Sequence, residues 1–118
     1  MSTINPVFTK VYRDKILGLV ANDANLGEGA GEVNQGTDCV AIGKDAGHED
    51  QGNQAIAIGK SSGYTNQGAD AIAIGENTAY QNQGDFAVAV GQAAGAVNQA
   101  TNAVAIGHGA ASDTQGTG

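Results

Sequence analysis

The sequence predicts an all-β fold, a parallel β-solenoid of about six coils, and two periodic features predict it. A phrase of alternating small and branched apolar residues, such as Ala71-Ile72-Ala73-Ile74-Gly75, occurs five times, with its closing glycine at positions 43, 59, 75, 91 and 107. A glutamine keeps the same constant spacing at positions 35, 51, 67, 83, 99 and 115. A fixed short period means that each repeat is one unit, which buries its apolar face against its neighbours. Sixteen residues hold two short strands and two turns, but they are too few for a pair of helices.

Residues 1–17 precede the repeats, and we expect them to cap the solenoid or to join it to a stalk, because a terminal coil exposes unpaired strand edges. Asn5 and Pro6 suit the start of a helix, and the apolar residues that follow them have helical spacing. Our interpretation is a short helix over residues 6–17. A strand stays open, since β-branched residues in the same stretch also alternate.

Residues 18–118 form the expected solenoid domain, and residues 18–33 are an imperfect first repeat, as terminal repeats often are. Each later repeat begins with Asn-Gln-Gly or a near variant. This triplet predicts a turn, because glycine supplies a positive φ and asparagine tolerates one. The strand phrase follows, and we expect its closing glycine to need a positive φ or a close backbone approach. A short arm then leads to a pair of small residues such as Thr78-Ala79, which implies another close approach.

The strand phrase has two faces, and their assignment decides what the solenoid can bind. Isoleucine and valine form one face and alanine forms nearly all of the other. We expect the larger side chains to fill the coil, because their burial contributes most to stability. The alanine face would then point outward. A flat face of alanine is unusually apolar for a solvated strand, and this favours self-association.

Composition and charge exclude several classes of protein. The 118 residues include 19 glycines and no tryptophan, and their formal net charge is −7. An acidic repeat surface argues against nucleic acid as a partner. No apolar stretch is long enough to insert into a membrane. The first residues also lack the pattern of a secretory signal, so we expect a virion component or an excised piece of a longer surface protein.

Chemical motifs are few, and we expect no enzyme activity, no catalytic residues and no cofactor. Cys39 is the only cysteine and replaces an alanine of the strand phrase, so we expect a buried packing residue. His48 and His108 occupy different repeat positions and are interpreted as surface residues. No cluster has the spacing of metal ligands, so no metal site is expected.

The strand phrase, followed by a small pair and a turn, resembles the head repeats of trimeric autotransporter adhesins, and similar repeats occur in fibre-like surface proteins of phages and of large algal viruses. The resemblance covers residues 18–116. It implies a left-handed β-roll, three copies of which pack around a threefold axis as a homotrimer. The rigid 16-residue period and the Asn-Gln-Gly triplet depart from the bacterial proteins.

These observations lead us to expect a structural and adhesive module, a rigid trimeric head or fibre segment on a virion or cell surface. A host cell-surface glycan or matrix protein is the expected partner besides the chain itself. Two alternatives stay open. One is a purely architectural spacer, and the other is an ice-binding solenoid, although the column from Thr37 to Thr117 is mixed where such a protein would repeat threonine.

Overall fold

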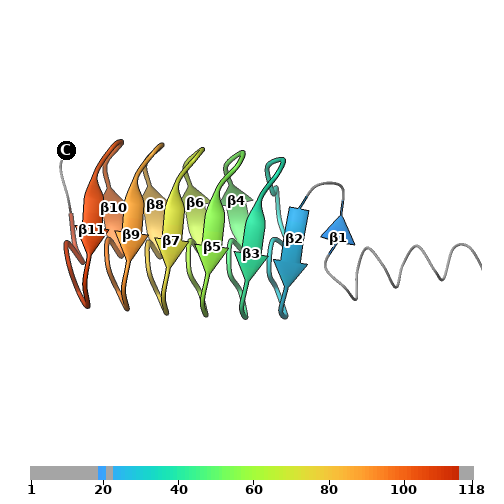
Figure 1. Ribbon diagram of the computed structural model, residues 1–118, viewed down its shortest axis with the longest axis horizontal. Coiled ribbons are helices and arrows are strands. Elements are labelled where there is room, and N and C mark those ends of the chain that lie inside the picture. The colour runs from blue at the N-terminus through green and yellow to red at the C-terminus, as the bar shows by residue number, and fades with distance from the viewer. Residues whose placement is uncertain (1–18, 21–22, 115–118) are drawn as a thin grey trace, which may run out of the picture.

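The computed structural model describes residues 19–20 and 23–114, and these residues form eleven short strands and no helix (Figure 1). The expected helix over residues 6–17 lies outside the described residues. The strands, in chain order, are β1 (Leu19–Val20), β2 (Asp23–Leu26), β3 (Val40–Ile42), β4 (Glu49–Gln51), β5 (Ile56–Ile58), β6 (Thr65–Gln67), β7 (Ile72–Ile74), β8 (Gln81–Gln83), β9 (Val88–Val90), β10 (Val97–Gln99) and β11 (Val104–Ile106).

The strands form two sheets that alternate along the chain. One sheet has the order β1-β2-β3-β5-β7-β9-β11, and the other contains β4, β6, β8 and β10. Apart from the antiparallel pair β1–β2, all neighbours are parallel, and equivalent residues pair across coils, as Val40 does with Ile56 and Ile56 with Ile72. The predicted parallel β-solenoid with a 16-residue repeat is confirmed. It has about five coils rather than six.

Backbone hydrogen bonds join each coil to the next at the strands and also at the turns. The N–H of Ile56 donates to the carbonyl of Ala71 at 2.9 Å, and the N–H of Gly59 donates to the carbonyl of Ile42 at 2.7 Å. Equivalent bonds recur once per repeat. The backbone is therefore satisfied by neighbouring coils, as a repeat that contacts only its neighbours requires.

The assignment of the two strand faces from the sequence was wrong. Alanine, and not isoleucine or valine, fills the interior: Ala57, Ala73 and Ala89 have no exposed surface, whereas Ile74 is 37% exposed. The alanines of the strands pack against small residues of the arms, and Ala73 and Ala89 form one cluster with Ala79 and Ala94. The alanine face is therefore the core, and it is not available as an interface.

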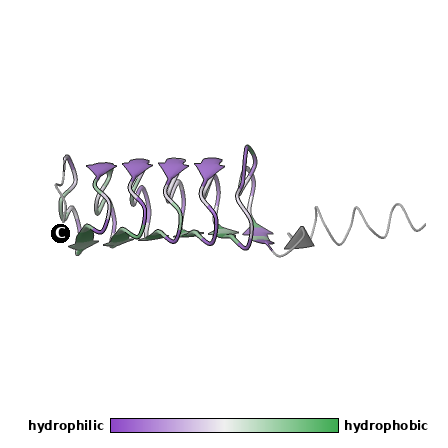
Figure 2. Cartoon of the chain, turned by 90° about the horizontal axis from the view of Figure 1, so that it is seen from above, coloured by the Kyte–Doolittle hydropathy of each residue, from purple (hydrophilic) through white to green (hydrophobic). Residues whose placement is uncertain are grey.

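The reason for this inversion is a column of buried glutamines that occupies the interior opposite the alanines. These residues, Gln51, Gln67, Gln83 and Gln99, are at most 3% exposed. Each is the last residue of a strand in the sheet of β4, β6, β8 and β10, which we call the polar sheet because its strands are hydrophilic (Figure 2). The amide of Gln67 donates to the carbonyl of Ile56 at 2.7 Å, in the opposite sheet. A glutamine side chain that spans the coil leaves room only for alanine on the facing strand. Larger side chains would overfill this space.

The Asn-Gln-Gly triplet is consequently not the turn that the sequence predicted. Asn66 and Gln67 lie within β6, and asparagine holds the positive φ, 57° at Asn66. Gly68 has no positive φ. Its role is close approach, because a Cβ there would lie 2.5 Å from the backbone nitrogen of Asp85, in the next coil.

The closing glycine of the strand phrase behaves as predicted. Gly75 has a φ of 129°, and a Cβ there would lie 2.9 Å from the backbone of Gly91 in the next coil. The small pairs on the arms also make the expected close approach. A Cβ on Gly63 would lie 2.8 Å from the side-chain oxygen of Gln67.

Candidate interaction surface

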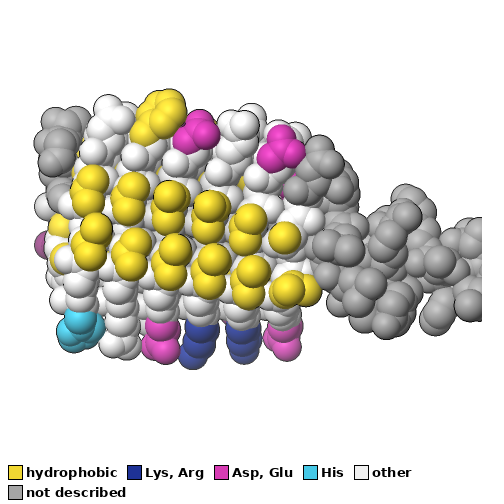
Figure 3. Space-filling model, viewed as in Figure 1, with side chains coloured by type: hydrophobic (Ala, Val, Ile, Leu, Met, Phe, Trp, Pro, Cys, Tyr) yellow, Lys and Arg dark blue, Asp and Glu magenta, His cyan; other side chains and the backbone are white. Residues whose placement is uncertain are grey.

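The sheet that contains β3, β5, β7, β9 and β11 is the apolar sheet, and its outward side carries two columns of isoleucine and valine (Figure 3). Because the alanines point inward, the branched residue before and after each alanine points to solvent. We call this surface the outward apolar face. It consists of Val40, Ile42, Ile56, Ile58, Ile72, Ile74, Val88, Val90, Val104 and Ile106. Three of the ten are exposed, Ile74 at 37%, Val104 at 51% and Ile106 at 66%, and the other seven are half-buried.

A mixed polar column borders the outward apolar face along the turns (Figure 3). It runs through Glu28, Lys44, Lys60, Glu76, Gln92 and His108. An apolar patch with a polar border is typical of a surface that contacts another macromolecule. Because the repeat is regular, the outward apolar face is flat and straight, and such a face suits a partner with the same repeat.

A second surface feature is the asparagine ladder on the polar sheet. The amide of Asn66 donates to the side-chain oxygen of Asn82 at 3.0 Å, and Asn82 donates to Asn98 at 2.9 Å. Asn34 makes the same bond to Asp50, at 3.0 Å. These groups already satisfy one another along the stack, so the ladder favours a stabilising role over recognition.

A stacked aromatic column was missed in the sequence. His48, Tyr64 and Tyr80 occupy equivalent positions in three successive repeats, and adjacent ring centroids lie 4.9 Å apart with interplanar angles of 9° and 7°. His48 also lies 3.3 Å from the carboxylate of Glu32. The signal in the sequence was the spacing of one repeat that separates His48 from Tyr64 and Tyr64 from Tyr80. His108, by contrast, is exposed on the last described coil.

Cys39 is buried, with 1% of its surface exposed, as predicted. Its thiol donates to the carbonyl of Gly52 at 3.0 Å. Burial raises the pKa of the Cys39 thiol, and the carboxylate of Asp23 adds to the rise, while a backbone hydrogen bond at Ala55 opposes it. A buried thiol with a raised pKa is a packing group and a poor nucleophile.

We expect Cys39 to react with Ellman's reagent at least about tenfold more slowly in the native protein than in the denatured protein at the same pH, because the thiolate forms only after local opening. The measurement is the rate of thiol release with and without guanidinium chloride. Equal rates in the two conditions would mean that the thiol is accessible in the folded coil.

No group of three His, Cys, Asp or Glu side chains is placed to hold a metal ion among residues 19–20 and 23–114. Within the same residues, no helix has the length and apolar character needed to cross a membrane. Two surface features are regular along the coils, namely the outward apolar face and the aromatic column of His48, Tyr64 and Tyr80.

No protein-family model, curated protein or solved structure matches this chain. What the fold supports by itself is a parallel β-solenoid of about five 16-residue coils with one apolar outer face.

Proposed function

We propose that this chain is a rigid segment of a homotrimeric surface fibre, with a structural role and a part in attachment to a host surface. The observation that carries the proposal is the outward apolar face. Ten β-branched side chains form two straight columns, and the part of their surface that is exposed would cost free energy if it stayed in water. Self-association removes this cost, and the identical repeat on each copy keeps the columns in register.

A threefold arrangement is the form of association that we favour. Each chain offers one flat apolar face on a narrow rod, and rods arranged around a common axis can all turn this face inward. The resemblance of the strand phrase to the head repeats of trimeric autotransporter adhesins adds to this choice. On the same resemblance, we propose that the coil is a left-handed β-roll and that the fibre belongs to a virion or cell surface.

Light scattering tests the trimer directly. The intact chain should have a mass of three times 11.7 kDa in solution. Ile74→Lys should lower this mass to that of one chain, because three lysines would meet at the axis without partners. Gln81→Lys is the matched control, since Gln81 is exposed on the opposite sheet, and it should stay trimeric.

The wild-type mass decides the proposal even if Ile74→Lys proves insoluble. A monomeric or dimeric wild type would contradict the trimer. A trimer that binds no cell surface, glycan or matrix protein would leave the architectural spacer as the function. The melting temperature of the trimer should also rise with protein concentration, because dissociation accompanies unfolding.

A further inference from the structure

The aromatic column stops at Tyr80, and a pocket adjoins this end of the column. His48, Tyr64 and Tyr80 stack with a constant separation of 4.9 Å. The next position in the column is Ala96. Tyr64 stacks on one face of the Tyr80 ring, and the equivalent residue of the next coil, Ala96, carries only a methyl group. A flat ring could continue the stack at this point.

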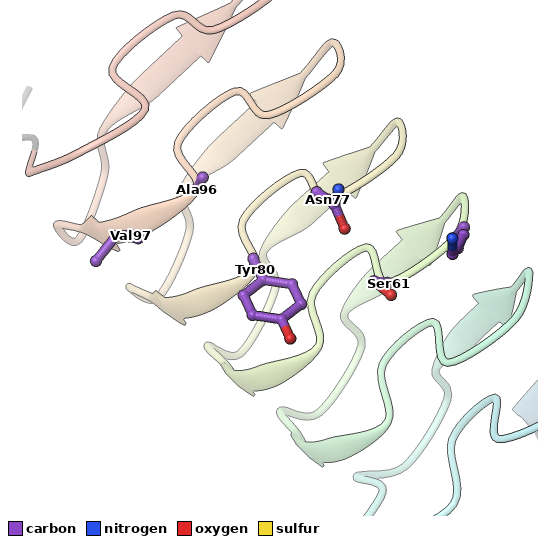
Figure 4. A pocket seen from close by; sticks show the side chains of 6 residues that line it. Ser61, Asn77, Tyr80, Ala96 and Val97 are labelled. Atoms are coloured by element: carbon purple, nitrogen blue, oxygen red, sulfur yellow. The ribbon is translucent and has the colours of Figure 1, made fainter.

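A pocket lies at this end of the column (Figure 4). Its volume is about 520 Å³, and it is open to solvent. Its lining residues come from three successive coils, and they are Lys60, Ser61, Asn77, Tyr80, Ala96 and Val97. None of them belongs to the outward apolar face, and of the six only Lys60 lies in the polar column that borders that face.

Three of the lining residues bring polar side chains to the pocket beside Tyr80. Ser61 contributes a hydroxyl and Asn77 an amide, and Lys60 contributes an ammonium group. In the described part of the chain, Lys60 forms no ion pair with a carboxylate. Lys44 and Lys60 are the only lysine or arginine residues among residues 19–20 and 23–114, so one of the two lies at this pocket.

We propose that this pocket binds a pyranose ring that carries a carboxylate, as in a uronic or sialic acid unit of a glycan. The apolar C–H face of the sugar stacks on Tyr80 above Ala96, in the position that the next ring of the column would take. Its hydroxyls bond to Ser61 and Asn77, and its carboxylate pairs with Lys60. At physiological salt charges beyond about 8 Å are largely screened, so the net charge of −7 acts at the pocket mainly through near neighbours such as Glu76, which follows Lys60 in the mixed polar column.

The neighbouring coils explain why only this position suits an acid. One coil toward the N-terminus, Asp45 takes the place of Ser61. One coil toward the C-terminus, Glu76 takes the place of Lys60 and Asp113 that of Val97. A slot moved in either direction would place a carboxylate beside the acidic sugar. The selectivity therefore depends on the column ending at Tyr80.

The test exploits the repeat, because the residues at equivalent positions show which substitutions the coil accepts. Ala96→Tyr extends the aromatic column, and Tyr80→Ala shortens it by one ring. Both variants should fold, since tyrosine and alanine each occur in this column. The intact protein and its variants are applied to an array of uronic acid and sialic acid oligosaccharides, each printed beside its neutral counterpart.

We expect the wild type to bind acidic oligosaccharides at least about tenfold more tightly than their neutral counterparts, as a charge-assisted pair allows. Ala96→Tyr and Tyr80→Ala should each reduce acidic-glycan binding at least about tenfold, with the melting temperature of Ala96→Tyr unchanged or raised. Lys60→Gln should remove the preference for the acid. Lys44→Gln, which alters the other lysine of the same column, should leave binding unchanged.

Equal binding of neutral and acidic sugars would overturn the proposal, and so would full binding by Ala96→Tyr. Binding of an aromatic peptide in place of every sugar would overturn it as well.

The inference rests on the attachment role proposed above and gives that role a site. The two fail separately. A monomeric wild type refutes the trimer and leaves the sugar site intact, whereas a trimer that ignores acidic glycans refutes the sugar site alone.

Discussion

Gly75→Ala should lower the free energy of unfolding by about 3 kcal/mol or more. Two costs combine at this position. A φ of 129° is accessible to glycine and strained for any residue with a Cβ. In addition, the new methyl group would lie 2.9 Å from the backbone of Gly91 and 2.6 Å from the hydroxyl of Thr78. The coils would have to separate to admit it, and the backbone bond from Gly75 to Ile58 would weaken.

Chemical denaturation of Gly75→Ala, followed by circular dichroism, measures this cost, and the chain supplies a matched control. Gly107 has a similar φ of 118°, but nothing lies within 4 Å of its would-be Cβ. Gly107→Ala should therefore show the cost of backbone strain without the steric cost. Glu76→Ala, on the exposed turn next to Gly75, gives the baseline for the coil. Equal stability of Gly75→Ala and Glu76→Ala would contradict the role assigned to the glycine.

The repeat period made the fold predictable. A strand phrase that returns at a constant interval defines where each coil begins, and the register Val40–Ile56–Ile72 follows from it. The closing glycines and the small pairs were also predictable, because their need for space is local. The number of coils was not predictable from the repeat. The first repeat contributes β2 but pairs on its other side with an antiparallel β1, so regular coils begin later than the sequence indicated.

The orientation of the strands could not be read from their own pattern. Alternation divides a strand into two faces, and the width of the interior decides which face fits inside. That width is set by Gln51, Gln67 and their equivalents across the coil. Asn25 illustrates the pairing of the two columns. It occupies an alanine position, and its side chain exchanges hydrogen bonds with the side chain of Gln35, which belongs to the glutamine column. A column of glutamine paired with a column of alanine was the signal that sequence reasoning missed.

The aromatic column was missed for a different reason. His48 was considered singly, and Tyr64 and Tyr80 were not singled out, because a lone histidine or tyrosine in a turn region carries little information. Their equivalent positions in successive repeats place the three rings in one line, and parallel coils bring them to stacking distance. The pocket at Ala96 then follows from an absent ring, which becomes visible only after the column has been recognised.

Gln67→Glu should destabilise the solenoid by about 3–5 kcal/mol at pH 7, the range found when a buried charge is left without a partner. Gln67 is 2% exposed, and its amide donates to the carbonyls of Ile56 at 2.7 Å and Ala71 at 3.4 Å. A carboxylate oxygen in the place of this amide would face two carbonyl oxygens. The other oxygen would still accept the hydrogen bond from Gln51, at 3.1 Å in the native protein.

The stability lost in Gln67→Glu should depend on pH, and the direction of this dependence identifies the buried charge as the cause. Burial and the two carbonyls disfavour the charged form, so the introduced carboxyl has a higher pKa in the folded than in the unfolded chain, where the pKa is about 4.3. Between these two values the folded state binds more protons, and stability therefore falls as pH rises. Below about pH 4 the protonated group can donate to Ile56, and most of the lost stability should return.

Denaturation of Gln67→Glu and wild type between about pH 3.5 and pH 8, at one protein concentration, provides the comparison, with each variant referred to wild type at the same pH. The range spans the unfolded value of about 4.3. Gln81→Glu makes the same chemical change at an exposed position of β8, and its stability relative to wild type should vary little with pH. A Gln67→Glu variant that matches Gln81→Glu at every pH would mean that the glutamine column does not hold the interior of the coil together.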